Sequence, residues 1–426
     1  MALRKRKPAP KLEYYDRLET RHPKGREAAL MLALPKLVAH AKKKAPGFAR
    51  ILKDVNPGKI TSREALAGLP VTRKSDLLEI QKQQPPLGGL NATPISRLAK
   101  LFVSPGPIYE PEGRGRDWWR TARGLFAGGF RPGDLVANSF SYHFTPAGSM
   151  LESGALALGC TVVPTGVGQT EMQAAAIAWL GVTGYIGTPS FLKLIVEKAD
   201  ELKLDLSRLK RAQVGAEYLP PAIRAAMKER GIAVTQMYGT ADLGLLAYES
   251  AMPDGTVNEG MILEESLILE IVRPGTGDPV PPGEVGEVVV TTLNLDYPLI
   301  RFGTGDLSAI LPGESPCGRT NARIRGWMGR ADQSTKVRGM FVTPRQVSEV
   351  LRRHPEVAKA RLVVEGEAGN DRMTLRCEVS ENNSGLSEAV VNSIRDVTKL
   401  RGEVELIEPG ALPNDGKVIE DLRKYS

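Results

Sequence analysis

Residues 135–165, LVANSFSYHFTPAGSMLESGALALGCTVVPT, contain the clearest indication of the fold class. The two ends of this stretch, LVANSF and CTVVPT, are short apolar segments bounded by polar residues, whereas residues 148–159 between them have the length and composition of a helix. A strand, a helix and a second strand in this order indicate two parallel strands joined by a helical crossover. This stretch therefore predicts a parallel sheet.

The same alternation continues downstream. Further strands are predicted at 183–188, 212–217 and 233–239, with helices at 190–202 and 219–231 between them. The second of these helices carries Ile223, Ala226 and Met227 on one face. Repeated strand–helix units predict a sheet that helices cover on both faces.

The two flanks of this region have different textures. Up to about residue 100 the chain reads as mostly helical, with proline-containing turns as punctuation. From about residue 267, the segments 266–272 and 283–293 are rich in β-branched residues and bounded by Gly and Pro, which favours an antiparallel barrel or sheet.

The last 95 or so residues read as a separate small α+β unit. Thr343 is expected to cap a helix, with Pro344 at its first position and Gln346 completing a capping box. Alternation of Met373, Leu375, Cys377 and Val379 predicts a strand with one buried face, so Cys377 is interpreted as core rather than as a nucleophile.

The predicted fold class is thus α/β. A large N-terminal domain (1–330) would contain several subdomains, with parallel sheets and helices plus a β-rich, barrel-like part. A small α+β C-terminal domain (331–426) would follow it. With 426 residues, 42% of them hydrophobic and 25% charged, the chain has the length for two or three domains.

Composition also restricts the classes of protein to which this chain can belong. No apolar run approaches the ~20 residues that span a bilayer, so we expect no membrane partner. The basic start, MALRKRKPAPK, lacks the apolar core of a secretion signal. The three cysteines lie far apart, which favours a reducing compartment, and we expect a cytoplasmic protein.

The net charge of +8 permits two interpretations. It can reflect a solvated basic surface, or a basic channel for an anionic substrate such as a nucleotide. No basic run is interleaved with aromatic residues, so nucleic acid is not an expected partner. We expect a monomer or a homodimer.

Several segments, taken in order, resemble the phenylacetate–CoA ligase group of the adenylate-forming (acyl-CoA synthetase) enzymes. They are 46–77, 162–173, 187–192, 214–217, 237–242, 298–308, 329–351 and 412–417. The resemblance implies a large domain carrying a small mobile C-terminal domain. It also implies a reaction that joins a carboxylic acid to ATP as an acyl-adenylate, from which coenzyme A displaces AMP. The implied cofactors are ATP, Mg²⁺ and coenzyme A.

The resemblance assigns roles to two segments of the nucleotide site. Residues 214–217 would lie beside the adenine, and Tyr238 would flank the ring. Ala241 stands where the family has a hydroxyl, and Asp242 would hold Mg²⁺, which prefers oxygen ligands. Taken alone, these segments are also compatible with a strand-end turn and a helix-capping turn. The implied nucleotide-binding residues here are Gly215, Ala216, Glu217, Tyr238, Gly239, Thr240 and Asp242.

Further roles follow toward the C-terminus. Asp306 would bind the ribose hydroxyls with help from Arg330, although Asp306 could also form an Asx turn. Lys417 would be the catalytic lysine of adenylation, although a lysine near a C-terminus is also an ordinary solvated charge. Asp332 would lie at the hinge, and Gly339 would line the pantetheine tunnel.

The acid pocket is expected near Tyr142, His143 and Phe144, which could contact a flat ring. His143 is open to two interpretations, a general base or a packed polar residue.

Two segments depart from the family pattern. The family has a Ser/Thr/Gly-rich phosphate loop, whereas residues 104–113 read SPGPIYEPEG, in which prolines remove backbone donors and Glu110 and Glu112 add negative charge. Some family members carry a structural zinc site, but the matching positions here include only Cys317, so we predict no zinc.

The leading hypothesis is an ATP-dependent, AMP-forming ligase that joins an aromatic or compact acid to CoA. The alternative is a catalytically impaired or regulatory homologue that binds AMP, acyl-adenylate or acyl-CoA. A third possibility is acyl transfer to a carrier-protein thiol, because a carrier arm and CoA present the same pantetheine.

Overall fold

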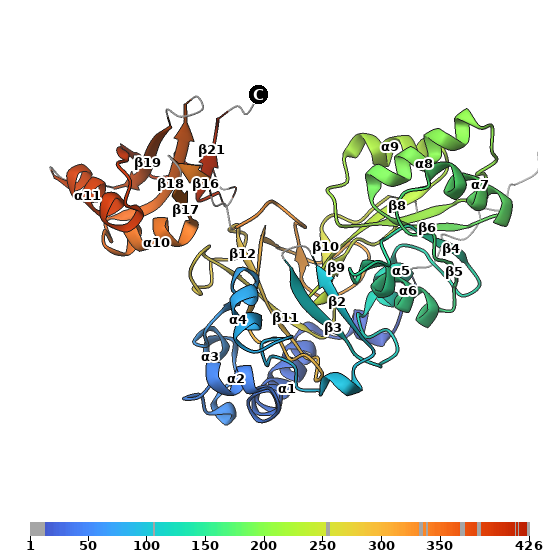
Figure 1. The fold of residues 1–426 in the computed structure, drawn as a ribbon, viewed down its shortest axis with the longest axis horizontal. Helices are drawn as coiled ribbons and strands as arrows, with labels where there is room; N and C mark the ends of the chain where they lie inside the picture. Colours follow the sequence, from blue (N-terminus) through green and yellow to red (C-terminus); the bar gives the residue numbers. More distant parts are fainter. Residues whose placement is uncertain are drawn as a thin grey trace, which may run out of the picture. The chain divides into compact units, whose positions relative to one another are not determined.

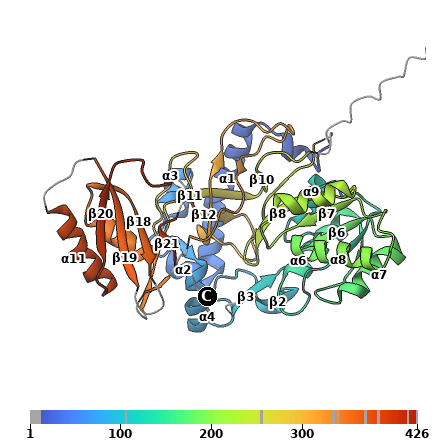
Figure 2. The ribbon, with the colours of Figure 1, turned by 90° about the horizontal axis from the view of Figure 1, so that it is seen from above.

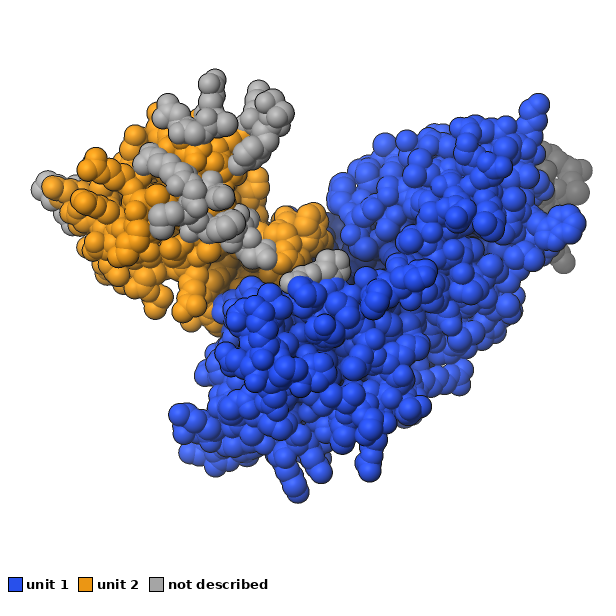
Figure 3. Space-filling view, in the orientation of Figure 1, with its two compact units in different colours: residues 1–268, 290–301, 311–326 blue, residues 269–289, 302–310, 327–426 orange. Residues whose placement is uncertain are grey.

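The structure is a computed structural model that describes residues 13–104, 107–252, 256–331, 335–337, 340–366, 371–380, 385–413, 415 and 417–423. The chain divides into two compact units (Figure 3). The first contains residues 1–268, 290–301 and 311–326, and the second contains residues 269–289, 302–310 and 327–426. Each unit is described by itself. The predicted hinge residue Asp332 and tunnel residue Gly339 lie outside the described residues.

The first unit contains the predicted parallel sheet, with its strands in the order β5-β4-β6-β7-β8. Each neighbouring pair among these five is parallel, which confirms the prediction made from residues 135–239. The strands are β4 (Leu135–Asn138), β5 (Thr161–Val163), β6 (Gly184–Gly187), β7 (Arg211–Val214) and β8 (Ala233–Thr240).

Helices cover both faces of this sheet, as predicted (Figure 1). One face packs against α7, α8 and α9 through a cluster that includes Ile177, Leu192 and Met227. The other face packs against α5 and α6 through a cluster that includes Leu125 and Met150. The helices are α5 (Thr121–Ala127), α6 (Ala147–Leu158), α7 (Thr170–Leu180), α8 (Pro189–Glu201) and α9 (Pro221–Glu229).

The sheet continues beyond β8 in the antiparallel sense. Strand β8 pairs with β9, β9 pairs with β10, and β10 pairs with β15. These strands are β9 (Gly244–Tyr248), β10 (Met261–Leu263) and β15 (Arg323–Ile324), and the short β14 (Ile310–Leu311) borders β15.

The N-terminal part is mostly helical, as expected. It contains α1 (Pro23–Lys44), α2 (Pro46–Ile51), α3 (Arg63–Ala67) and α4 (Leu77–Gln83), together with the short strand β1 (Thr72–Arg73) and the 3-10 turn Lys74–Asp76. A hairpin of β2 (Lys100–Ser104) and β3 (Ile108–Glu112) follows. None of the helices in the described part of the chain is long and apolar enough to cross a membrane.

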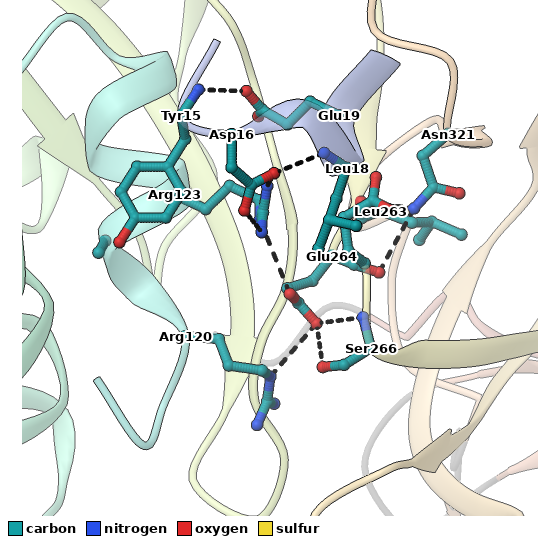
Figure 4. Close-up of polar contacts among 12 residues, drawn as sticks. Tyr15, Asp16, Leu18, Glu19, Arg120, Arg123, Leu263, Glu264, Ser266 and Asn321 are labelled. Carbon is teal, nitrogen blue, oxygen red and sulfur yellow. Dashed lines mark hydrogen bonds and ion pairs between the residues drawn. The ribbon is translucent and has the colours of Figure 1, made fainter. Parts of the chain in front are cut away.

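A network of charged groups ties helix α5 to its surroundings in the first unit (Figure 4). Arg123 donates two hydrogen bonds to Asp16, at 3.0 and 2.8 Å. Arg120 forms an ion pair of 3.4 Å with Glu264. Arg123 and Glu264 are buried, and Asp16 and Arg120 are partly buried, so each charge depends on its partner. The network therefore fixes α5 in place.

The second unit contains all of β13 (Phe302–Ser308) and most of β11 (Leu267–Val272) and β12 (Gly286–Thr292), and β12 lies between the other two strands in the sheet. Its C-terminal part has a sheet in the order β20-β19-β18-β21, on which α10 and α11 pack. Figure 2 shows α11 beside the four strands. These elements are α10 (Pro344–Arg352), α11 (Leu386–Thr398), β18 (Val357–Glu365), β19 (Arg372–Val379), β20 (Glu403–Ile407) and β21 (Ile419–Asp421), and a hairpin of β16 (Thr335–Val337) and β17 (Met340–Val342) precedes them.

Two local predictions for this part are confirmed. Helix α10 begins with the expected capping box, in which Thr343 and Gln346 bond each other's backbone N–H groups. Cys377 is fully buried on β19 among apolar residues, and burial raises the pKa of its thiol to about 12. A thiol that stays protonated at neutral pH is not a nucleophile, so Cys377 is a core residue.

Candidate active site

A cavity of about 220 Å³ opens in the first unit beside strands β7 and β8. Its apolar wall comes from α6, β8, β9 and the segment after β4, and consists mainly of Phe140, Met150, Leu151, Met237 and Leu245. The cavity includes residues that follow the carboxyl ends of β7 and β8, which is where open α/β sheets bind their ligands.

Residues predicted to bind the nucleotide contribute to this cavity. Gly215 and Ala216 after β7, and Gly239 and Thr240 at the end of β8, all line it. Ala216 has a left-handed backbone, with φ of 63°, which is unusual for a residue with a side chain and points to a functional position.

Gly239 has no room for a side chain, because an added Cβ would lie 2.7 Å from the carbonyl oxygen of Gly244. The neighbouring Tyr238 is buried, whereas Glu217 is exposed and accepts a weak hydrogen bond of 3.4 Å from the backbone N–H of Ser190.

The predicted acid-pocket triplet lies next to this cavity but does not form its lining. The lining comes instead from the flanking residues Phe140 and 145–147. Tyr142 accepts a hydrogen bond of 2.8 Å from Asn138, and its pKa is raised, mainly by burial. His143 and Phe144 are exposed. These three residues remain predicted contacts of the acid.

The predicted metal ligand Asp242 has an unpredicted partner. Its Oδ2 lies 2.6 Å from the Nζ of Lys74, which stands just after β1. The Asp242 side chain is fully buried, and its Oδ1 has no hydrogen-bond partner among the described residues. One carboxylate oxygen is thus neutralised by an ammonium, and the other is left for a ligand.

Two further buried groups lie near Asp242. Burial raises the pKa of Glu110 on β3 to about 7, and the charge of Asp242 contributes to the same shift. The hydroxyl of Tyr297 is buried without a hydrogen-bond partner in the described part of the chain. Burial, with the charges of Asp242 and Glu110, also raises the pKa of Tyr297. The ammonium of Lys74 therefore pairs with Asp242, and its charge also acts on Glu110.

The hairpin that carries Glu110 stands at the place in the sequence where the resemblance implies a phosphate loop. Strands β2 and β3 are paired up to Ser104 and Ile108, so residues 105–107 are the whole connection between them. Two of these three residues are prolines, which have no backbone N–H to offer a phosphate. The hydroxyl of Ser104, which a phosphate loop would use, donates to Glu110 instead.

The second unit contains the predicted ribose residues, and it brings them together. Asp306 on β13 accepts hydrogen bonds from Arg330 at 2.9 Å and from Trp327 at 3.1 Å. The segment around Arg330 runs antiparallel to β13, with an isolated bridge between Asp306 and Arg330. Two donors hold the carboxylate in one orientation, as a ribose-binding acid requires.

Lys417 lies on the surface of the second unit. Its Nζ is 3.3 Å from Glu420, and its side chain is 47% exposed. A solvent-exposed ion pair of this kind contributes on the order of 0–1 kcal/mol, so it does not prevent the amine from moving to another partner.

The positions that would form a zinc site in the family are close together, but they contact one another by hydrogen bonds. Cys317 lies 3.1 Å from the hydroxyl of Ser315, which accepts from Asn258 at 2.9 Å. In the described part of the chain, no three His, Cys, Asp or Glu residues form a group that could hold a metal ion. The prediction of no zinc remains a prediction.

Two residues of this site were missed from the sequence. Lys74 lies within 46–77, a segment that carries the resemblance but in which the resemblance assigns no role to a single residue. Gln213 is a polar residue inside the apolar strand β7, and it lines the cavity. A lone amide in a buried strand was the available signal.

Comparisons with known proteins agree with this geometry. The AMP-binding enzyme family matches residues 117–295, and the AMP-binding enzyme C-terminal domain matches residues 339–422. The phenylacetate-coenzyme A ligase of Thermus thermophilus is 32% identical to this chain, over 92% of this chain and 95% of that protein. This chain belongs to the phenylacetate–coenzyme A ligase family.

Other members of this family and a solved structure support the assignment. The phenylacetate-coenzyme A ligase of Aromatoleum evansii is 31% identical, over 88% of each chain. A crystal structure of 2-hydroxyisobutyryl-CoA ligase, in an open conformation with 2-HIB-AMP and CoA, superposes with a TM-score of 0.71 at 25% identity. It covers 96% of this chain and 93% of that one.

Membership of the phenylacetate–CoA ligase family confirms the predicted class, an enzyme that ligates an acid to a thiol. The family uses ATP, Mg²⁺ and coenzyme A. The residues present fit a magnesium ion of the kind that nucleotides bring with them, because Mg²⁺ is usually held by one or two carboxylates together with phosphates and water. Asp242 Oδ1 is the buried oxygen available for that contact.

Proposed function

We propose that this chain is an ATP-dependent, AMP-forming CoA ligase for a compact, mainly apolar carboxylic acid. The observation that carries the proposal is the cavity in the first unit. Its wall is apolar, it continues to the Gly215–Ala216 and Gly239–Thr240 backbones, and its 220 Å³ is smaller than the ~300 Å³ at which ordinary small-molecule pockets begin. A small acid fits such a site.

In the first step, a carboxylate oxygen of the acid attacks the α-phosphorus of ATP. The acyl-adenylate forms and pyrophosphate leaves. In the second step, the thiol of coenzyme A attacks the acyl carbon, the thioester forms, AMP leaves, and the thiol proton passes to solvent. We propose that Lys417 stabilises the charge that develops in the first step, because an ammonium can contact both the acid and the α-phosphate.

Residues from several segments of the chain would hold the nucleotide. Gly215, Ala216 and Glu217 would lie along the adenine, and Tyr238 would flank it. In the second unit, Asp306 would accept hydrogen bonds from the ribose hydroxyls, with Arg330 fixing its orientation. Mg²⁺, when bound, would supply positive charge to the phosphates, with Asp242 as its protein ligand.

The phosphate end of the site would depend on a side chain rather than on a loop. The β2–β3 connection lacks the donors of a phosphate loop, whereas the ammonium of Lys74 stands beside Asp242. We propose that Lys74 is the cation that receives the phosphates.

The remaining assignments complete this proposal. The functional border would lie at residues 330 and 331, with Asp332 as the hinge and Gly339 beside the pantetheine arm. The acceptor thiol would be that of coenzyme A. The three free, buried cysteines fit a reducing cytoplasm, and the chain would act as a monomer or homodimer on small molecules, without nucleic acid.

The alternative, a homologue that binds acyl-adenylate without making it, finds support in the short β2–β3 connection. The relatives, which are ligases at about 30% identity over most of the chain, favour the active enzyme.

ATP–pyrophosphate exchange with a panel of small aryl and alkyl acids tests the choice. We expect exchange that depends on the acid, followed by CoA thioester formation. Absence of exchange with every acid, together with tight binding of AMP, would establish the binding-only alternative.

A further inference from the structure

The cavity contains one polar feature that the proposed reaction does not use, the amide of Gln213. This side chain is 1% exposed and projects from β7 toward α5 and α6, the face on which the cavity lies. Its Oε1 accepts a hydrogen bond of 2.7 Å from the hydroxyl of Thr235 on the neighbouring strand. Its Nε2 is buried and has no hydrogen-bond partner among the described residues.

The other polar side chains around the cavity differ from Gln213 in this respect. Thr121 donates to the carbonyl oxygen of Met150 at 2.9 Å, Ser104 donates to Glu110, and Thr240 accepts from Leu243 at 3.1 Å. Of the described side chains that line the cavity, Gln213 alone has a buried polar atom without a partner. A buried donor left unpaired is costly, so its persistence in the wall points to a ligand.

The position of the Gln213 amide along β7 indicates which part of a bound acid it would contact. Gln213 precedes Gly215 by two residues on the same face of β7, so at 3.3 Å per residue it lies about 7 Å deeper than the strand's end. Its register partner Thr235 precedes Gly239 by four residues on β8, about 13 Å along the strand. The amide thus faces the end of the acid that is remote from its carboxylate.

The hydrogen-bonding capacity of the Gln213 amide restricts the kind of substrate group that it could recognise. As oriented, Gln213 offers a donor to the cavity. With its oxygen and nitrogen exchanged it would offer an acceptor, while Thr235 would still be bonded. A hydroxyl can accept in the first case and donate in the second, so it satisfies either orientation. An unsubstituted ring or a methyl group satisfies neither.

We propose that the substrate is a compact acid with a hydroxyl group at the position remote from its carboxylate, and that Gln213 recognises this hydroxyl. The proposal rests on the ligase function and names the substrate class of the same site. Most of the remaining wall is apolar, and Ser104, Thr121 and Thr240 have partners within the protein. This hydroxyl would therefore be the polar feature by which the pocket distinguishes acids of one size.

Gly128 provides an independent way to move the amide. It lies at the end of α5 with φ of −76°, a conformation that alanine accepts without strain. A Cβ added there would lie 2.5 Å from Gln213 Oε1 and 2.6 Å from Thr235 Oγ1. Gly128→Ala therefore displaces the amide without changing its chemistry.

The test compares phenylacetate with its 3-hydroxy, 4-hydroxy and 4-methyl derivatives in thioester formation by the full chain. We expect kcat/KM for one hydroxylated acid to exceed that for the plain and methyl acids by about tenfold to hundredfold. Gln213→Leu should remove this preference, because it should lower kcat/KM for the hydroxylated acid and leave kcat/KM for the plain and methyl acids unchanged. Gly128→Ala should reduce the ratio as well.

Gln173→Leu is the matched control, because Gln173 is also a buried glutamine but has its hydrogen bonds satisfied by Ser139, Gly166 and Gly168. It should lower stability and leave the ratio unchanged. A Gln213→Leu enzyme that keeps the hydroxyl preference, or a wild-type enzyme that favours the methyl acid over both hydroxy acids, would overturn the proposal.

Binding of sulfamoyl analogues of the four acyl-adenylates, measured by calorimetry, separates this inference from the ligase function. If exchange fails with every acid but the hydroxylated analogue binds more tightly and loses this advantage in Gln213→Leu, the recognition stands and the ligase function falls. If turnover is normal but both measurements show no hydroxyl preference, the recognition falls and the ligase function stands.

Discussion

The β2–β3 hairpin and strand β13 were both expected to serve the same nucleotide, one at the phosphates and the other at the ribose. Strand β13 keeps its carboxylate, with Asp306 oriented by Arg330 and Trp327. The hairpin has prolines where the family pattern has a Ser/Thr/Gly-rich loop, and its carboxylate Glu110 is buried beside the group predicted to hold the metal. The predicted ribose region has the carboxylate that the resemblance implies, whereas the hairpin has charged side chains where the family pattern has backbone donors.

We infer that ribose recognition and phosphate binding place different demands on the sequence. Ribose recognition needs one carboxylate in one place, and few other groups accept two hydrogen bonds from a diol. Phosphate charge can be balanced by any cation within reach, and Lys74 is already paired to Asp242 at 2.6 Å. We therefore expect substitutions at the ribose end to be severe and changes in the hairpin to be modest.

The largest effect is expected at Lys417, because neither the β2–β3 hairpin nor β13 supplies an amine that could take its role. Lys417→Ala should lower the rate of adenylation by about 10²–10³-fold, the usual loss when a group that stabilises transition-state charge is removed. Thioester formation from supplied acyl-adenylate should persist. Exchange kinetics and a half-reaction assay measure the two steps, with the exposed Lys228→Ala as control. Equal losses in both steps would show that Lys417 has no specific part in adenylation.

The next effect tests the ribose end. Asp306→Asn should lower kcat/KM for ATP by about 10–100-fold, because a charge-assisted hydrogen bond contributes about 1.5–3 kcal/mol. The KM for the acid should hardly change. Asp278→Asn, an exposed aspartate in the same unit, is the control. An unaltered ATP dependence would place the ribose elsewhere and remove one side of the comparison.

Much of this architecture could be predicted from the sequence, because the parallel sheet depends on local patterns. The strands at 135–138 and 184–187 are apolar runs between helices, and the capping box at Thr343 is a four-residue signal. The partnership of Lys74 with Asp242 could not be predicted in this way, since the two residues are 168 positions apart. Neither could the cavity wall, which Phe140 and residues 145–147 form beside the predicted triplet.

A third prediction concerns the stability of the hairpin. Burial raises the pKa of Glu110 to about 7 from its ordinary 4.5, so the folded state resists ionisation of this carboxyl. Stability should therefore decline as pH rises from about 4.5 to 7 and remain lower above that range. Glu110→Gln, which is neutral at every pH, should be more stable than the wild type at pH 8, by about 2 kcal/mol, and equal to it near pH 4.

Denaturant unfolding at the two pH values measures this difference. Gln can still accept the hydrogen bond that the backbone N–H of Ser104 donates to Glu110 at 3.2 Å, so the comparison isolates the charge. A variant that is destabilised at both pH values would show that the Glu110 carboxylate is required by the hairpin rather than tolerated.

The smallest effect is expected from replacing the prolines of the hairpin by residues that have a backbone N–H. Pro105→Ser together with Pro107→Ser would restore two backbone N–H groups in the β2–β3 connection. If the phosphates lie close to this connection, each new hydrogen bond contributes about 0.5–1.5 kcal/mol and ATP–pyrophosphate exchange should rise severalfold. If Lys74 alone receives the phosphates, exchange should stay at the wild-type rate, and Lys74→Met should then remove it in both backgrounds. This pair of outcomes decides whether the hairpin is a weakened phosphate loop or has no remaining part in binding ATP.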